Sequence, residues 1–187
     1  MDCDKIASFV KASVEALPAV PPCGVRYRVS ATLIDGTLLP CVVIEPRKPF
    51  VDLAVRRFEE ERSRGIAGTL GPSGGYPKIV ETFVTAGNCL SHYDIGSLQL
   101  SEFAIPLARL REVRGETSAG WTEFYGAMGD GREFCFGTAF GREFFDMPPG
   151  YVATDIQKIV PATRGEKRKY EEVYRERPYF TCYIDGI

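Results

Sequence analysis

Residues 27–33 read YRVSATL, and apolar and polar side chains alternate along them without interruption. Successive side chains of a strand point to opposite faces, so this alternation is typical of a strand with one buried face. Asp35-Gly36 follows shortly after, and both residue types tolerate the positive φ that a tight hairpin turn requires. The mostly apolar run from Leu38 to Glu45 then supplies a returning strand. We therefore predict an antiparallel β-hairpin at this point of the chain.

A second hairpin is predicted between Trp121 and Phe140, with its turn at Asp130-Gly131. Along its returning strand, one face carries large side chains and the other carries small ones. The large ones are Phe134, Phe136 and Phe140, and the small ones are Cys135, Gly137 and Ala139. This separation by size suits a sheet that curves tightly or is closely covered. It favours a strongly bent sheet or a small barrel similar in outline to an SH3-like barrel.

Helices and further strands are expected around the hairpins. Apolar residues at helical spacing predict helices at residues 4–17, 49–64 and 105–113. A capping pattern of Thr163 with Glu166 predicts a charged helix over residues 163–177. Strands are expected at residues 78–86, 92–100 and 179–184. The predicted fold class is therefore α+β, rich in antiparallel β-hairpins, with N-terminal, middle and C-terminal helices.

The length of 187 residues suits a single compact domain over residues 1–187. The alternative is two β subunits, about 24–104 and 115–163, with a helix and loop inserted at 49–76 and a helix and strand at 163–187. Each hairpin turns at Asp-Gly, and each is followed by an Asp-Ile pair, at Asp94 and at Asp155. An internal duplication would produce this arrangement, and so would chance recurrence of a common turn. If the two units arose by duplication, the groove between them is the natural ligand site.

Composition limits the classes of function. The chain has 23 basic and 25 acidic side chains, so nucleic-acid binding would need a local patch. It has no run of 18 apolar residues, which predicts no membrane span, and its start lacks the pattern of a signal peptide. Six scattered cysteines and a single histidine predict no metal site and no cofactor. We expect reduced, structural thiols in a cytoplasmic protein.

The weak candidates for catalysis are Ser73, Cys89, His92 and Asp94. Ser73 lies in GPSGG, residues 71–75, which matches the G-x-S-x-G nucleophile elbow but lacks the helix that should follow it. His92 would be its base, and Asp94 is placed to orient that histidine. Cys89 would be a nucleophile only if His92 lowered the pKa of its thiol. A small hydrolase or transferase that uses the Gly65–Gly75 loop with His92 is therefore one alternative function.

The candidate binding residues are aromatic, because such side chains commonly anchor protein interfaces. They are Tyr170, Tyr174, Tyr179, Phe180 and Trp121. The predicted final strand, residues 179–184, would also offer an edge for strand addition.

The basic residues of Arg164–Lys169 lie beside tyrosines, which suggests single-stranded nucleic acid as another alternative. Interleaved glutamates favour a salt-bridged helix surface over that alternative. With no complete catalytic motif, our leading hypothesis is a non-catalytic binding or regulatory protein that recognises another macromolecule, in particular a protein.

Overall fold

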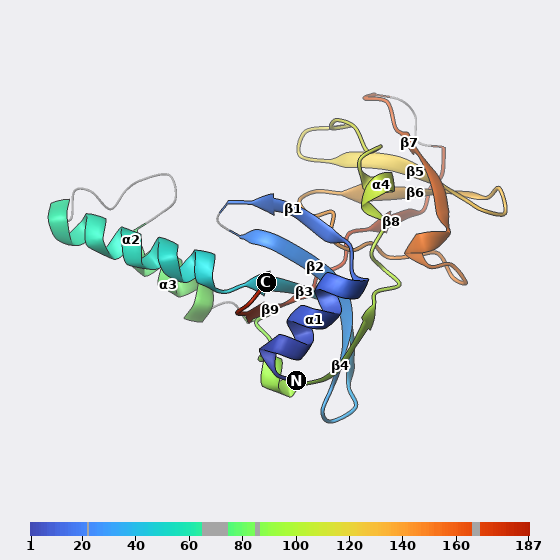
Figure 1. Ribbon diagram of the computed structural model, residues 1–187. Helices are drawn as coiled ribbons and strands as arrows, with labels where there is room; N and C mark the ends of the chain where they lie inside the picture. The colour runs from blue at the N-terminus through green and yellow to red at the C-terminus, as the bar shows by residue number, and fades with distance from the viewer. Residues whose placement is uncertain (22, 65–74, 85–86, 166–168) are drawn as a thin grey trace.

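The computed structural model describes residues 1–21, 23–64, 75–84, 87–165 and 169–187. Within these ranges the chain forms two β-sheets, of five and four strands, and four α-helices (Figure 1). This confirms the α+β class and the N-terminal and middle helices. The strong bending and the SH3-like barrels stay predictions. None of the described helices is long and apolar enough to cross a membrane.

The first sheet is built on the hairpin that residues 27–45 predict. Its strands run in the order β1-β2-β3-β9, and β4 pairs with the far end of β2. Only the β3–β9 pair is parallel. The strands are β1 (Ala16–Val20), β2 (Gly24–Leu33), β3 (Leu38–Pro46), β4 (Ile95–Leu100) and β9 (Phe180–Ile184).

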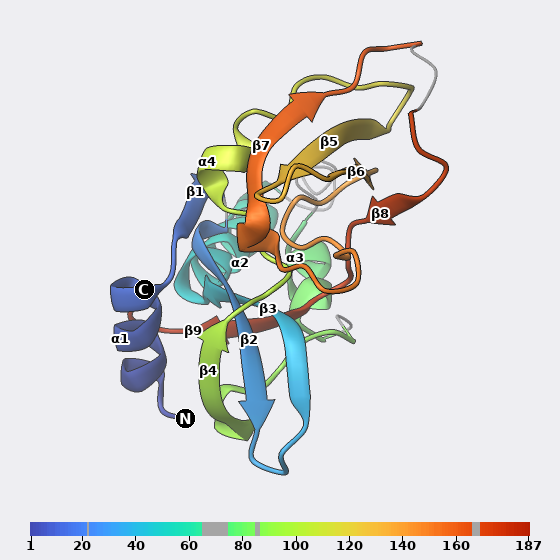
Figure 2. The same cartoon turned by 90° about the vertical axis from the view of Figure 1, so that its right-hand side faces the viewer.

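The second sheet is built on the other predicted hairpin and has the order β7-β5-β6-β8. In Figure 2 it lies above the first sheet. Its only parallel pair is β6–β8. The strands are β5 (Thr122–Met128), β6 (Glu133–Thr138), β7 (Ile156–Pro161) and β8 (Val173–Arg175).

Four strands of the first sheet correspond to the four strands of the second, and β1 has no counterpart among the described residues. Each sheet contains a hairpin, an antiparallel strand beside the hairpin's first strand and a parallel strand beside its second. The register of the β2–β4 ladder corresponds to that of the β5–β7 ladder. Val29 pairs with Leu100 in the first, and Phe124 pairs with Pro161 at the equivalent place in the second. In both sheets this ladder shifts just before its last pair, at Leu33 with Ile95 and at Met128 with Ile156.

The hairpin ladders of the two sheets differ in one respect, and the strands of one sheet lie inside those of the other along the sequence. β3 pairs with β2 through an irregularity between Val29 and Ala31, whereas the β5–β6 ladder is regular. Strands β5 to β8 lie in the sequence between β4 and β9, so the second sheet is nested inside the first. The recurrent Asp-Gly and Asp-Ile pairs therefore occupy equivalent places, while a duplication as their origin stays a prediction.

The two hairpin turns share one hydrogen-bonding scheme. Leu33 N donates to Thr37 O at 2.8 Å, and Met128 N donates to Arg132 O at 2.8 Å. The turn glycines have φ of 88° at Gly36 and 87° at Gly131, a region that residues with a Cβ rarely adopt. In each turn the aspartate Oδ1 accepts the backbone N–H two residues later, at 2.9 Å and 3.0 Å.

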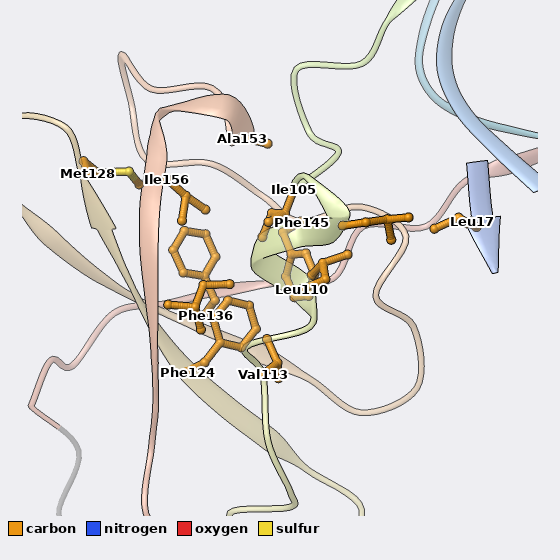
Figure 3. Packing of buried hydrophobic residues seen from close by; sticks show 12 residues of the cluster. Leu17, Ile105, Leu110, Val113, Phe124, Met128, Phe136, Phe145, Ala153 and Ile156 are labelled. Carbon is orange, nitrogen blue, oxygen red and sulfur yellow. The ribbon is translucent and has the colours of Figure 1, made fainter. Parts of the chain in front are cut away.

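Each sheet has its own hydrophobic core. Helix α1 (Cys3–Ser13) lays Ile6 and Val10 on the first sheet, against Val29 and Ile44. The core of the second sheet lies under the short helix α4 (Leu107–Leu110), where Phe124 and Phe136 stack at 5.4 Å. Figure 3 shows that Leu17 of β1 reaches this second core, so the first sheet contributes to it.

Helices α2 (Lys48–Arg64) and α3 (Tyr76–Val84) lie side by side and reach away from both sheets (Figures 1 and 2). The first turn of α2 is anchored by Phe50, whose ring meets that of Tyr183 edge-on at 5.4 Å. Farther along, Phe58 of α2 contacts Tyr76 of α3 in the same way at 5.3 Å. The pair of helices is therefore held to the body of the protein mainly at one end.

Several predicted elements are wrong or shorter than expected. The helix predicted at 105–113 covers only Leu107–Leu110, and the strand predicted at 92–100 begins at Ile95. Residues 78–86, predicted as a strand, begin in helix α3, because their apolar residues fit helical spacing as well and Pro77 suits a first helical turn. The predicted helix over residues 163–177, the expected C-terminal helix, is contradicted at Gly165 (φ 77°) and at β8, where pairing with β6 overrides helix propensity. The first helix ends at Ser13, because Leu17 belongs to a strand.

Strand β2 differs from its prediction in being buried on both faces. Arg28 and Ser30, on the face opposite α1, are each 4% exposed. Arg28 Nη1 donates to Ile105 O at 2.8 Å and to Glu143 O at 3.2 Å, and its Nη2 lies 3.7 Å from a Glu15 carboxylate oxygen. Ile105 belongs to the segment that leads from β4 into the second sheet, and Glu143 belongs to the connection between β6 and β7 of that sheet. Arg28 therefore joins the sheets.

We expect Arg28→Ala to lower the free energy of unfolding by about 2–4 kcal/mol, because it leaves the carbonyl oxygens of Ile105 and Glu143 without their donor. Urea denaturation followed by circular dichroism measures the change. Arg132→Ala is the control, since its pair with Asp130 is solvent-exposed and contributes less than about 1 kcal/mol. An equal loss in both variants would contradict the assigned role of Arg28.

Candidate functional site

The four weak catalytic candidates do not form a site among the described residues. Ser73 and residues 71–74 of the GPSGG motif lie outside the described residues. The His92 ring is buried, with its Nδ1 3.1 Å from Met1 O and its plane against Tyr93 at 3.9 Å. The backbone carbonyl of Asp94 accepts a hydrogen bond from Ile34 N. His92 therefore holds the first residue of the chain against the end of β4.

Cys89 lacks the surroundings of a nucleophile. Its side chain is exposed, and no hydrogen bond links it to His92 in the part of the chain that the structure describes. Partial burial, followed by the charge of Glu45, raises the pKa of its thiol. A catalytic cysteine requires the opposite shift. Over the described residues, histidine, cysteine and carboxylate side chains also form no group that could hold a metal ion.

The edge of β9 is partly occupied, contrary to the expectation of a free edge for strand addition. Leu90 N donates to Thr181 O at 2.8 Å, and Thr181 N donates to Asn88 O at 3.0 Å. Residues 88–90 thus form a short parallel bridge along β9. A partner strand could not pair with Thr181 without displacing them.

The outer face of the second sheet, opposite its core, is crossed by residues 163–165 and 169–172, which we call the strap. Lys169 N donates to Tyr125 Oη at 3.3 Å, and the Lys169 ammonium lies 4.9 Å from the centre of the Tyr125 ring. The Tyr170 ring meets Tyr125 edge-on at 5.9 Å. The strap therefore covers Tyr125, which is only 2% exposed although it lies on the face opposite the core.

Trp121 covers the small residues of the same face. A Cβ on Gly137 would lie 2.2 Å from the indole ring, so only glycine lets the ring lie flat on the sheet. The indole Nε1 donates to Glu123 Oε1 at 2.8 Å, and the Arg175 guanidinium lies 5.3 Å from the ring centre. Trp121 lines a small groove of about 260 Å³ on one side of the strap, together with Glu123 and Tyr125.

A larger groove of about 490 Å³ lies on the other side of the strap, and we call it the aromatic groove. It is lined by Gly131, Arg132, Glu133, Phe134, Cys135, Tyr170, Glu172 and Tyr174. The rings of Phe134 and Tyr174 meet edge-on at 5.9 Å. Burial raises the pKa of both tyrosines. A nearby carboxylate raises it further, that of Glu133 for Tyr170 and that of Glu172 for Tyr174. Both phenols therefore stay neutral at physiological pH.

The remaining two aromatic candidates lie at the first sheet. Tyr179 lines a groove of about 450 Å³ between the sheets, together with Phe144, Glu143 and the almost fully exposed Phe140. Phe180 is 39% exposed and, as the next residue of an extended segment, points to the opposite face. The structure thus brings together Tyr170 and Tyr174, and it separates Trp121, Tyr179 and Phe180 from them.

Sequence reasoning missed the partners of these tyrosines. Phe134, Glu133 and Glu172 complete the aromatic groove, yet only Phe134 attracts notice in the sequence, as part of a bulky strand face. Their meeting depends on the parallel pairing of β6 with β8, for which the sequence has no local signal.

No family model, no curated protein and no solved structure matches this chain. The chemistry of its own residues is therefore the basis for assigning a function.

We expect Cys89 to react fastest with Ellman's reagent in the folded protein, and Cys41, Cys135 and Cys182 to react only after unfolding. Cys89 is exposed, whereas burial raises the pKa of Cys41 to about 11 and that of Cys182 to about 12. Stopped-flow absorbance at pH 8 measures the phases, and Cys89→Ser should remove the fastest one. Rapid labelling of Cys41 or Cys182 without denaturant would show that their burial is wrong.

Proposed function

We propose that this protein is a non-catalytic binding protein that recognises another protein, and that its aromatic groove accepts a lysine or arginine side chain of the partner. The observation that carries the proposal is a groove of about 490 Å³ that three aromatic residues and two glutamates line, with Phe134 and Tyr174 also packed against the core of the second sheet. The rings belong to Phe134, Tyr170 and Tyr174, and the carboxylates to Glu133 and Glu172.

Rings and carboxylates together favour a cationic ligand. A cation is attracted to the face of an aromatic ring, and a carboxylate adds a charge-assisted hydrogen bond. The outer face of the sheet, where Tyr170 contacts Tyr125, already holds two of the chain's own cations in that manner. Lys169 lies over Tyr125 and 3.5 Å from a Glu133 oxygen, and Arg175 lies over Trp121.

Glu172 is the carboxylate best placed for a partner. Lys169 already pairs with Glu133, and Arg132 pairs with Asp130 at 3.6 Å. Among the described residues no cation pairs with Glu172, which is exposed at the groove and interacts with the Tyr174 hydroxyl. A lysine or arginine of the partner would supply the missing positive charge.

The two alternative functions have less support. His92 is engaged by Met1 and Tyr93, which argues against its use as a base. Carboxylates on both sides of the strap would repel a nucleic-acid backbone.

We also propose a cytoplasmic location, supported by six free cysteines, and an origin of the two sheets by internal duplication, supported by their shared register.

The test is a peptide library with a fixed central lysine or arginine and random flanks, compared with a library that has norleucine at that position. We expect the protein to retain the cationic library, and Glu172→Lys to weaken retention about tenfold or more, because it replaces an attractive charge with a repulsive one. Fluorescence polarisation of the enriched peptides measures the affinity.

Glu171→Lys is the matched control, because it changes the net charge equally at the neighbouring exposed residue, which does not line the groove. Tyr170→Ala should weaken binding as Glu172→Lys does. Equal retention of the norleucine library, or an equal loss in the Glu171 variant, would refute the proposed groove.

A further inference from the structure

Another groove lies between the two sheets, where the sequence predicts a ligand site if the hairpins form two units. We call it the arginine groove, and its volume is about 310 Å³. It is lined by Leu17, Pro18, Arg26, Leu107, Leu110, Arg111, Val113, Arg142 and Glu143. These residues come from β1, β2, α4, the residues just after α4 and the segment after β6, so the groove exists only where the sheets meet.

The floor of the groove is apolar. Leu17, Leu107, Leu110 and Val113 line it, and each is 5–8% exposed. They belong to the core of the second sheet, where Figure 3 shows Leu17 approaching from the side of β1. Because this core holds them in place, the floor is rigid and can receive an apolar group without first rearranging.

The rim of the groove is strongly basic. Arg26 is half-buried and already engaged, with its Nη1 3.0 Å from Glu143 and 3.9 Å from Glu45. Arg111 and Arg142 are exposed, and neither pairs with an acidic side chain among the described residues. Three guanidinium groups therefore border one apolar floor, against a single lining carboxylate, that of Glu143.

We infer that the arginine groove binds a small organic anion that carries a phosphate or carboxylate group on an apolar body. Guanidinium groups bind either head group through paired, charge-assisted hydrogen bonds. The apolar body would lie on the leucine and valine floor. Arg111 and Arg142, which pair with no acidic side chain among the described residues, would supply two positive charges to a phosphate monoester. The volume lies at the lower end of the range of about 300–1,000 Å³ for small-molecule sites.

This site is distinct from the aromatic groove in position and in sign of charge. The two share no lining residue. The aromatic groove has glutamates for a cation, and the arginine groove has guanidinium groups for an anion. The inference therefore goes beyond the proposed function and does not rest on it.

The test is isothermal titration with three ligands that share one aromatic body: 1-naphthyl phosphate, 1-naphthylacetate and the neutral 1-naphthalenemethanol. We expect the anions to bind and the neutral alcohol to bind at least about tenfold more weakly, since charge-assisted contacts provide much of the affinity. The tighter of the two anions identifies the head group. Added salt should weaken the binding of both anions.

Arg111→Gln and Arg142→Gln should each weaken anion binding about fivefold to tenfold without unfolding the protein, because both side chains are exposed. Arg114→Gln is the matched control, since Arg114 is exposed on the same segment but does not line the groove. Glu172→Lys should leave anion binding unchanged, which separates this site from the aromatic groove.

Several results would overturn the inference. These are equal binding of the neutral alcohol, an equal loss in the Arg114 variant, and no binding of either anion. Tighter binding of an acidic, leucine-containing peptide than of either naphthyl anion would also overturn it, because it would identify the groove as a protein-binding surface.

Discussion

The buried guanidinium of Arg28 is the interaction on which the arrangement of the two sheets depends. Burial lowers its pKa to about 10, opposed in part by Glu15 and Glu143, so the group still carries its charge at neutral pH. A buried charge persists only where hydrogen bonds and a counter-charge offset the cost of desolvation. Arg28 finds them in Ile105 O, Glu143 O and the Glu15 carboxylate. Each of these partners lies on a different segment, so one side chain fixes three of them relative to β2.

The nesting of the second sheet explains why such a link is needed. The chain leaves the first sheet after β4 and returns to it only as β9. Phe103 and Tyr179, one from each connection, pack against a cluster that includes Cys41 and Val43, on the face of the first sheet opposite α1. Glu15 adds a second fixed point, because its carboxylate accepts Leu107 N at 2.7 Å, at the start of α4. The arginine groove lies beside this junction, and Arg26 faces it from the same side of β2 as Arg28.

The sequence predicts the parts of this fold that depend on neighbouring residues. Alternation and an Asp-Gly turn locate both hairpins, because turn and strands lie within about twenty residues. Residues 173–175 are different, since three residues next to a charged segment become a strand only through pairing with β6. The alternation in β2 correctly indicates which side chains share a face. It wrongly implies that the polar face is exposed, because polar side chains can be buried where hydrogen bonds and a counter-charge are supplied, as they are to Nη1 and Nη2 of Arg28.

The same limit applies to the candidate sites. Tyr170 and Tyr174 could be chosen from the sequence as aromatic residues, but their pairing with Phe134 and Glu133 joins parts of the chain about forty residues apart. Arg111 belongs to a visible basic cluster, yet its neighbour across the groove, Arg142, lies in a loop that attracts no notice in the sequence. The net charge of −2 averages over these places. The near-neutral net charge conceals one acidic and one basic groove. Each groove attracts ligands of the opposite charge and repels the ligands that the other groove binds. Local charge, set by which distant residues the nested sheets bring together, is therefore a better guide to ligands here than composition.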